Sequence, residues 1–314
     1  MSLQFLLMLV LAFAVVIAVL VARTLIHRRA TEPDSAPADL AEIARWTARW
    51  RWSGVVLGLL LGSAAFLSAQ RPVALGRLAL ASPALAAAAM IAGVVVGEAT
   101  AHPSRTTTRT AALTTRSWRH LLPRTRTAVV GGGIGILTTL LVIGTWAGSP
   151  DDLGRAGRAL RATCEVALPD SGTTMQTSIS TPWPGSFYAG PAAIAVVACL
   201  ALAAAGAVAI HRRANPSAAS PGLDWELRRE AMTNLVTAVG VMAFGTAVPI
   251  ATIMAMILSS NDCARGGDTF AGMLVVVAIG CAVVAAALLA RLLLPRRRGL
   301  LVAPSAPDLS ARPR

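Results

Sequence analysis

The chain has 314 residues, of which 55% are hydrophobic and 14% are charged, and its mean hydropathy is +0.64. Soluble domains average about a quarter charged residues, so this composition excludes an ordinary soluble protein. The formal net charge is +13 and all 28 basic residues are arginine. Such a balance suggests nucleic acid in a soluble chain, but here the arginines flank apolar segments and we predict no nucleic-acid partner.

Seven apolar segments are long enough to cross a membrane as helices. We therefore predict an all-α, polytopic membrane protein in which residues 1–298 form one seven-helix domain and residues 299–314 form a disordered cytoplasmic tail. The expected spans are about 3–22, 53–69, 78–97, 127–147, 191–210, 233–259 and 270–294. The first span is not expected to be a cleaved signal peptide, because positive charge follows it and does not precede it.

The charges fix the expected orientation, because cytoplasmic loops of membrane proteins collect positive charge. Residues 23–52, 98–126 and 211–232 are the expected cytoplasmic loops, and residues 148–190 form the long outer loop. With the tail, the cytoplasmic side then holds 22 of the 28 arginines and nine of the 15 acidic residues. The outer side holds six of each. This asymmetry predicts an N-terminus outside and a C-terminus inside, and the lysine-free, alanine-rich composition favours a bacterial plasma membrane.

Glycines at helical spacing predict close packing between spans. Small residues four apart lie on one stripe of a helix and let another backbone approach. The expected packing positions are Gly54, Gly58, Gly62, Gly93, Gly97, Gly131 and Gly135. We favour a seam within the chain over a face between two copies.

Two further patterns leave alternatives open. Residues 39–50 fit either a separate amphipathic helix at the headgroups or a downward extension of the second span. The Ala-His-Pro-Ser of residues 101–104 and the Ala-Asn-Pro-Ser of residues 214–217 hint weakly that spans three and four duplicate spans five and six.

A basic island at residues 97–126 is the most polar segment between two spans. Its candidate contact residues are Glu98, His102, Arg105, Arg109, Arg116 and Arg119. Each arginine near the surface attracts anionic lipid headgroups by about 1 kcal/mol, which suffices to explain the island. One functional alternative is docking of a cytoplasmic protein or nucleotide on residues 105–126 together with residues 224–229. The other is a gate or substrate contact at Glu98, which otherwise pairs with an arginine of the island.

The outer loop contains the strongest covalent prediction. Cys164 and Cys263 both fall in outer loops, where disulfides form, so we predict that they pair, whereas Cys199 and Cys281 lie in spans as packing residues. Residues 154–166 are expected to form a helix with Leu153, Leu160 and Cys164 toward the protein. Arg155, Arg158 and Arg161 are then candidate contacts for an anionic ligand, or a solvated face balanced by nearby acids. Trp183 is expected to touch the membrane or a partner.

No catalytic residue, metal site or cofactor is predicted, because phosphate-binding, zinc-protease and serine-hydrolase motifs are missing from the sequence. The spans also lack ionisable residues near their middles, which proton-coupled carriers need. We therefore expect a non-enzymatic accessory or sensory protein that binds a partner or lipid. The alternatives are a small permease for a neutral or amphiphilic solute, and a lipid-modifying enzyme that uses Glu98, His102 and His120.

Overall fold

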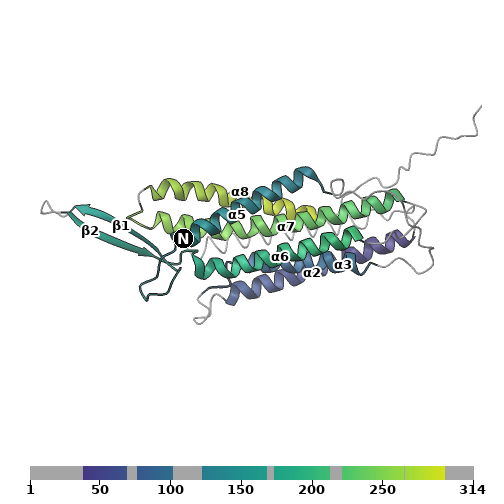
Figure 1. Cartoon of the computed structure of the whole chain (residues 1–314), viewed down its shortest axis with the longest axis horizontal. Helices are drawn as coiled ribbons and strands as arrows, with labels where there is room; N and C mark the ends of the chain where they lie inside the picture. The colour runs from purple at the N-terminus through teal and green to yellow at the C-terminus, as the bar shows by residue number, and fades with distance from the viewer. Residues whose placement is uncertain are drawn as a thin grey trace, which may run out of the picture.

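The computed structural model describes residues 38–68, 76–101, 122–167, 173–212, 221–264 and 266–293. Their main elements are long helices that run along one axis and a two-stranded sheet at one end of the bundle (Figure 1). The predicted first span at residues 3–22, the predicted tail and residues 102–121 of the basic island lie outside the described residues.

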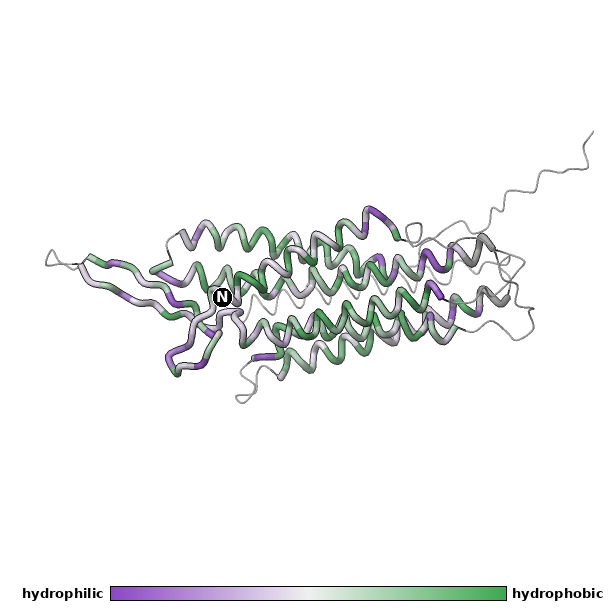
Figure 2. Tube along the Cα trace, in the orientation of Figure 1, coloured by the Kyte–Doolittle hydropathy of each residue, from purple (hydrophilic) through white to green (hydrophobic). Residues whose placement is uncertain are grey.

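Six helices are long and apolar enough to cross a membrane, which indicates a multi-pass membrane protein. They are α2 (Ala38–Ser68), α3 (Ser82–Ala99), α5 (Arg124–Ala147), α6 (Ser186–Arg212), α7 (Pro221–Ser259) and α8 (Gly267–Leu293). Each covers one predicted span. Figure 2 shows that hydrophobic residues fill the middle of the bundle and that hydrophilic residues gather toward its two ends.

Helix α7 is the centre of the packing, because it contacts α3, α5, α6 and α8. Met242, Ala247 and Ile250 in its middle have no exposed surface. Helix α2 lies outside this core and packs along α3. Helices α6 and α7 pack together, but α3 and α5 make little contact over their described lengths. The two hairpins of the suggested repeat are therefore packed differently.

Several helices extend beyond the predicted spans, α2, α6 and α7 by the most. Helix α2 runs without a break from Ala38, so residues 39–50 extend the second span and do not form a separate interfacial helix. Helix α6 begins at Ser186, and Pro191 lies inside it. Pro191 is the sixth residue of the helix, and because it has no backbone N–H it removes one hydrogen bond to the carbonyl group four residues earlier.

The outer loop contradicts the all-α prediction. Residues 154–166 do not form a helix; strand β1 (Leu160–Ala167) pairs antiparallel with β2 (Thr173–Ser180), and Cys164 lies opposite Gln176. Gly154 and Gly157 have positive φ angles of 75° and 68°, which interrupt any helix before β1. Within β1, exposed side chains alternate with partly buried ones from Leu160 to Glu165, as expected for a strand.

The glycine seam joins α2 to α3 within one chain. A Cβ atom added at Gly54 would lie 2.7 Å from the carbonyl oxygen of Ala89, and one at Gly93 would lie 2.6 Å from that of Trp50. A Cβ atom at Gly58 would lie 2.5 Å from the carbonyl oxygen of Ala86, and ones at Gly62 and Gly97 would lie 3.1 and 3.0 Å from the Cβ atoms of Ala86 and Trp50. The two backbones are therefore too close for any larger residue at the centre of the seam.

Helix α5 uses other glycines than the predicted ones. A Cβ atom at Gly131 or Gly135 would meet nothing within 4 Å among the described residues. The close contacts are at Gly133, which lies against the ring of Phe244, and at Gly144, which lies against the carbonyl oxygen of Pro184. Close packing at Gly131 and Gly135 therefore stays a prediction, because a run of glycines does not indicate which of them faces the described helices.

Replacing Gly54 with valine is expected to destabilise the protein by about 1–3 kcal/mol, because the new side chain meets backbone atoms that cannot rotate away. The matched control is Gly280→Val in α8, where a Cβ atom meets nothing within 4 Å among the described residues. Thermal unfolding in detergent measures both variants. Equal destabilisation would show that helix propensity, and not the seam, sets the effect.

Candidate functional site

Trp183 anchors the chain between the hairpin and α6, at the end of the bundle that we call the hairpin end. Its side chain is 2% exposed, and its indole N–H donates a 2.8 Å hydrogen bond to the carbonyl oxygen of Gly144. Its backbone N–H donates to the carbonyl oxygen of Arg158 at 2.9 Å. The expectation that Trp183 touches the membrane or a partner was wrong, because the fold buries it and satisfies its polar atom.

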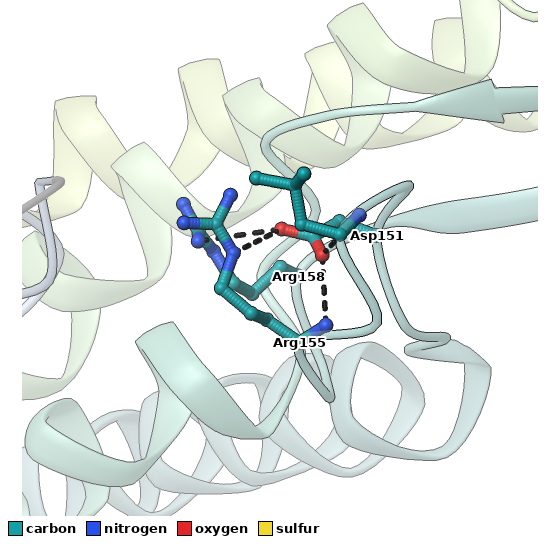
Figure 3. Close-up of polar contacts among 4 residues, drawn as sticks. Asp151, Arg155 and Arg158 are labelled. Atoms are coloured by element: carbon teal, nitrogen blue, oxygen red, sulfur yellow. Dashed lines mark hydrogen bonds and ion pairs between the residues drawn. The ribbon is translucent and has the colours of Figure 1, made fainter.

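A cluster of one aspartate and two arginines precedes the hairpin, in the loop between α5 and β1 (Figure 3). Asp151 is buried, and its Oδ1 accepts hydrogen bonds from the backbone N–H groups of Leu153 and Arg155. Its Oδ2 accepts a 2.8 Å hydrogen bond from Nε of Arg155 and lies 3.3 Å from Nη1 of Arg158. Arg155 and Arg158 thus meet at one carboxylate. Leu153, predicted to face the protein, is instead 70% exposed.

Burial by itself would raise the pKa of Asp151, but the hydrogen bonds and positive charge of Arg155 outweigh it and hold the pKa below its ordinary value of 3.8. A depressed pKa in the folded state contributes stability above the unfolded pKa. That contribution is lost as pH falls below about 4, through the lower folded pKa.

We therefore expect the loop at residues 151–158 to lose hydrogen-exchange protection as the pH falls below about 4. Asp151→Asn is expected to be less protected at neutral pH and to lose this pH dependence. Asp152→Asn is the matched control, because Asp152 is exposed beside the cluster. A wild-type profile that is flat across this range, or one that Asp151→Asn leaves unchanged, would contradict the role of the carboxylate.

Two arginines stack on one aromatic ring beside this cluster. The guanidinium carbon of Arg158 lies 4.8 Å from the centre of the Phe187 ring, and that of Arg77 lies 5.4 Å from it. Phe187 also meets Tyr188 edge to face, with ring centres 4.9 Å apart. Arg158 is 8% exposed, whereas Arg77 is exposed. Residues from the loop before α3, the loop after α5 and the start of α6 therefore form one site.

An apolar cavity of about 150 Å³ lies at the same end. It is lined by Gly76, Ala79, Leu80, Pro182, Trp183, Pro184, Tyr188 and Ile253. Gly76 immediately precedes Arg77, and Tyr188 immediately follows Phe187. The cavity and the arginine pair therefore involve neighbouring residues of the same two segments.

The hairpin is fixed to the bundle near its middle and at its base. Cys164 and Cys263 form a disulfide, the pairing that their positions in the outer loops predicted, with sulfurs 2.08 Å apart. Asn261 donates a 3.1 Å hydrogen bond to Oγ of Ser180 at the end of β2. The loop between α7 and α8 thus holds both strands. Arg161 lies on β1, exposed and opposite Ile179, so the structure separates it from Arg155 and Arg158.

The basic island is only partly described. Glu98 lies in the last full turn of α3 and is partly buried. His102, Arg105, Arg109, Arg116, Arg119 and His120 lie outside the described residues. Cys199 and Cys281 are buried in α6 and α8 as free thiols. The structure therefore provides a describable site at the hairpin end, and no geometry for the proposed island contacts.

The chain matches no known protein-family model, no curated protein and no solved structure. Sequence reasoning also missed Arg77 and Phe187 as site residues. They are separated by 110 positions in the chain, and no sequence signal connects them.

Proposed function

We propose that the chain is a non-enzymatic accessory or sensory protein of a bacterial plasma membrane, and that it binds a protein partner through the hairpin. The observation that carries this proposal is that β1 and β2 project beyond the ends of the helices (Figure 1) while a disulfide at Cys164, near the middle of β1, fixes them to the bundle. A hairpin with only two strands is marginally stable in water. The covalent anchor supports a segment that buries little surface of its own.

The surface of the hairpin supports binding. Met175 is 64% exposed, and Val166 and Ile179 are also exposed. Among the described residues the sheet has two strands, so each strand has an outer edge, and such an edge is a template for another chain. A partner strand that pairs with one edge gains backbone hydrogen bonds, which provide affinity. Contacts with the exposed apolar side chains of the hairpin then provide specificity for the sequence of the partner strand.

The proposal includes the predicted topology, with seven spans, the N-terminus outside and the hairpin on the outer side. The described part of the opposite end supports this orientation by its charge. Arg45, Arg49, Arg212, Arg229 and Arg291 all lie toward that end, as expected for a cytoplasmic face.

The test is purification of the tagged full-length protein from its native membranes in a mild detergent, followed by mass spectrometry. We expect a stoichiometric protein partner with the wild type and its loss with Met175→Arg on the hairpin. Leu153→Arg is the matched control, because Leu153 is 70% exposed at the same end but lies outside the hairpin. Recovery of the wild-type protein with lipid alone, or an equal partner yield from both variants, would contradict partner binding at the hairpin.

A further inference from the structure

We infer that the hairpin end also holds a binding site for a small amphiphilic anion. A carboxylate or phosphate group would bind at Arg77 and Arg158, and a compact apolar group joined to it would occupy the cavity beside Trp183. This inference does not depend on whether the hairpin binds a protein.

The first support is an excess of positive charge. Arg77, Arg155 and Arg158 gather around Phe187 and Asp151, and Asp151 is the only carboxylate that forms an ion pair with them among the described residues. The oxygens of Asp151 already accept two backbone hydrogen bonds and one from Arg155, and Oδ2 also lies at ion-pair distance from Arg158. The cluster therefore has a net charge of +2 and little remaining acceptor capacity.

The second support is that Arg158 has buried donors without acceptors. Its Nε and Nη1 atoms are buried and form no hydrogen bond among the described residues, although Nη1 lies at ion-pair distance from Asp151. A buried donor without an acceptor is costly, and more so when it is charged. An oxyanion at this guanidinium would supply an acceptor and form a charge-assisted hydrogen bond.

The position of Arg77 adds to this. Its guanidinium and that of Arg158 both lie within 5.4 Å of the centre of the Phe187 ring, so they are at most twice that distance apart. Arg77 is exposed, and Phe187 is its described contact. One anion near the ring is therefore attracted by both charges, and Arg77 is accessible to a ligand from solution.

The third support is the cavity, which determines the class of ligand. Its volume is about 150 Å³, and Leu80, Trp183, Tyr188 and Ile253 contribute to its wall. The cavity is not fully enclosed, and its volume is about that of an apolar cavity that accepts a benzene-sized molecule. Because Arg77 and Phe187 are sequence neighbours of lining residues, an acid joined to such a group by a short linker reaches both parts of the site.

The test uses the full-length protein in detergent micelles with 4-fluorophenylacetate as the probe and fluorine NMR as the readout. We expect saturable binding above that of empty micelles, and binding about tenfold weaker with Arg77→Gln, as for the loss of one charge-assisted contact. Arg161→Gln, which removes the same charge from an exposed position on β1, is expected to leave binding unchanged. Ala79→Leu fills the cavity and is expected to abolish binding.

Neutral 4-fluorobenzyl alcohol has the same ring without the charge and is expected to bind at least tenfold more weakly. The inference is overturned if the alcohol binds as well as the acid, if Arg77→Gln has no effect, or if the acid shows no saturable binding. Arg77 is exposed, so its variant is expected to fold and decides the question even if Ala79→Leu does not fold. Repeating the titration in nanodiscs distinguishes the sources of the anion. Competition by phosphatidylglycerol but not phosphatidylcholine identifies a lipid headgroup, and equal binding in both identifies a soluble acid.

Discussion

Trp183→Ala is expected to lower the free energy of unfolding by about 3–5 kcal/mol, the usual cost of removing a buried aromatic side chain. Trp183 is 2% exposed, it lines the cavity, and its indole N–H satisfies the carbonyl oxygen of Gly144. The substitution enlarges the cavity and leaves this carbonyl group without its partner. Thermal or denaturant unfolding in detergent measures the loss.

Trp146→Ala provides the matched control for this prediction. Trp146 is 87% exposed near the end of α5, only two residues from Gly144. Exposed substitutions usually change stability by less than about 0.5 kcal/mol. Similar losses of unfolding free energy in the two variants would mean that burial of Trp183 does not stabilise the hairpin end.

Breaking the Cys164–Cys263 disulfide is expected to destabilise the hairpin end by about 2–4 kcal/mol, because the bond closes a long loop in the unfolded chain. The two cysteines are 99 positions apart. We expect Cys164→Ser or a reductant to increase hydrogen exchange of residues 160–180 first, since little else holds the exposed strands. The lining of the cavity is expected to change less, because Trp183 keeps its own hydrogen bonds.

Cys281→Ala serves as the control for this experiment, because Cys281 is a buried free thiol in α8. Its thermal unfolding is expected to respond to reductant as the wild type does. Retention of wild-type protection in the hairpin of Cys164→Ser would contradict the role of the disulfide as the anchor.

The sequence was sufficient to predict the six described spans, because long apolar runs leave few structures other than membrane helices. It also indicated the α2–α3 seam, since Gly54, Gly58 and Gly62 fall on one stripe and the neighbouring span has matching glycines. The Cys164–Cys263 pairing followed from topology, since both residues lie in loops at the same end.

The hairpin was missed for a local reason. The arginines, alanines and leucines of residues 155–162 favour a helix. The helix prediction relied on this preference, whereas in the structure exposed and partly buried side chains alternate from Leu160 to Glu165, as in a strand. The threonines and serines of residues 173–180 were the overlooked signal, because their strand has to pair with a neighbour. Once β1 is a strand, Arg161 and Arg158 no longer share a face, which explains why the predicted arginine trio separates.

The site at Phe187 required the fold itself. Arg77 precedes α3, Arg158 precedes β1 and Phe187 begins α6, so three separate loops must meet before the two arginines share a ring. The burial of Trp183 also depends on tertiary structure, because a tryptophan between two prolines is equally compatible with an exposed turn.

Photo-crosslinking in intact cells tests the central claim most directly, because it detects a partner at the hairpin before detergent is added. A photoreactive amino acid at position 175 on β2 is compared with one at position 153, which is equally exposed but lies outside the hairpin. Partner binding through the hairpin predicts one dominant protein adduct from position 175 and none from position 153. Adducts to lipid alone from position 175, or the same protein adduct from both positions, would contradict it.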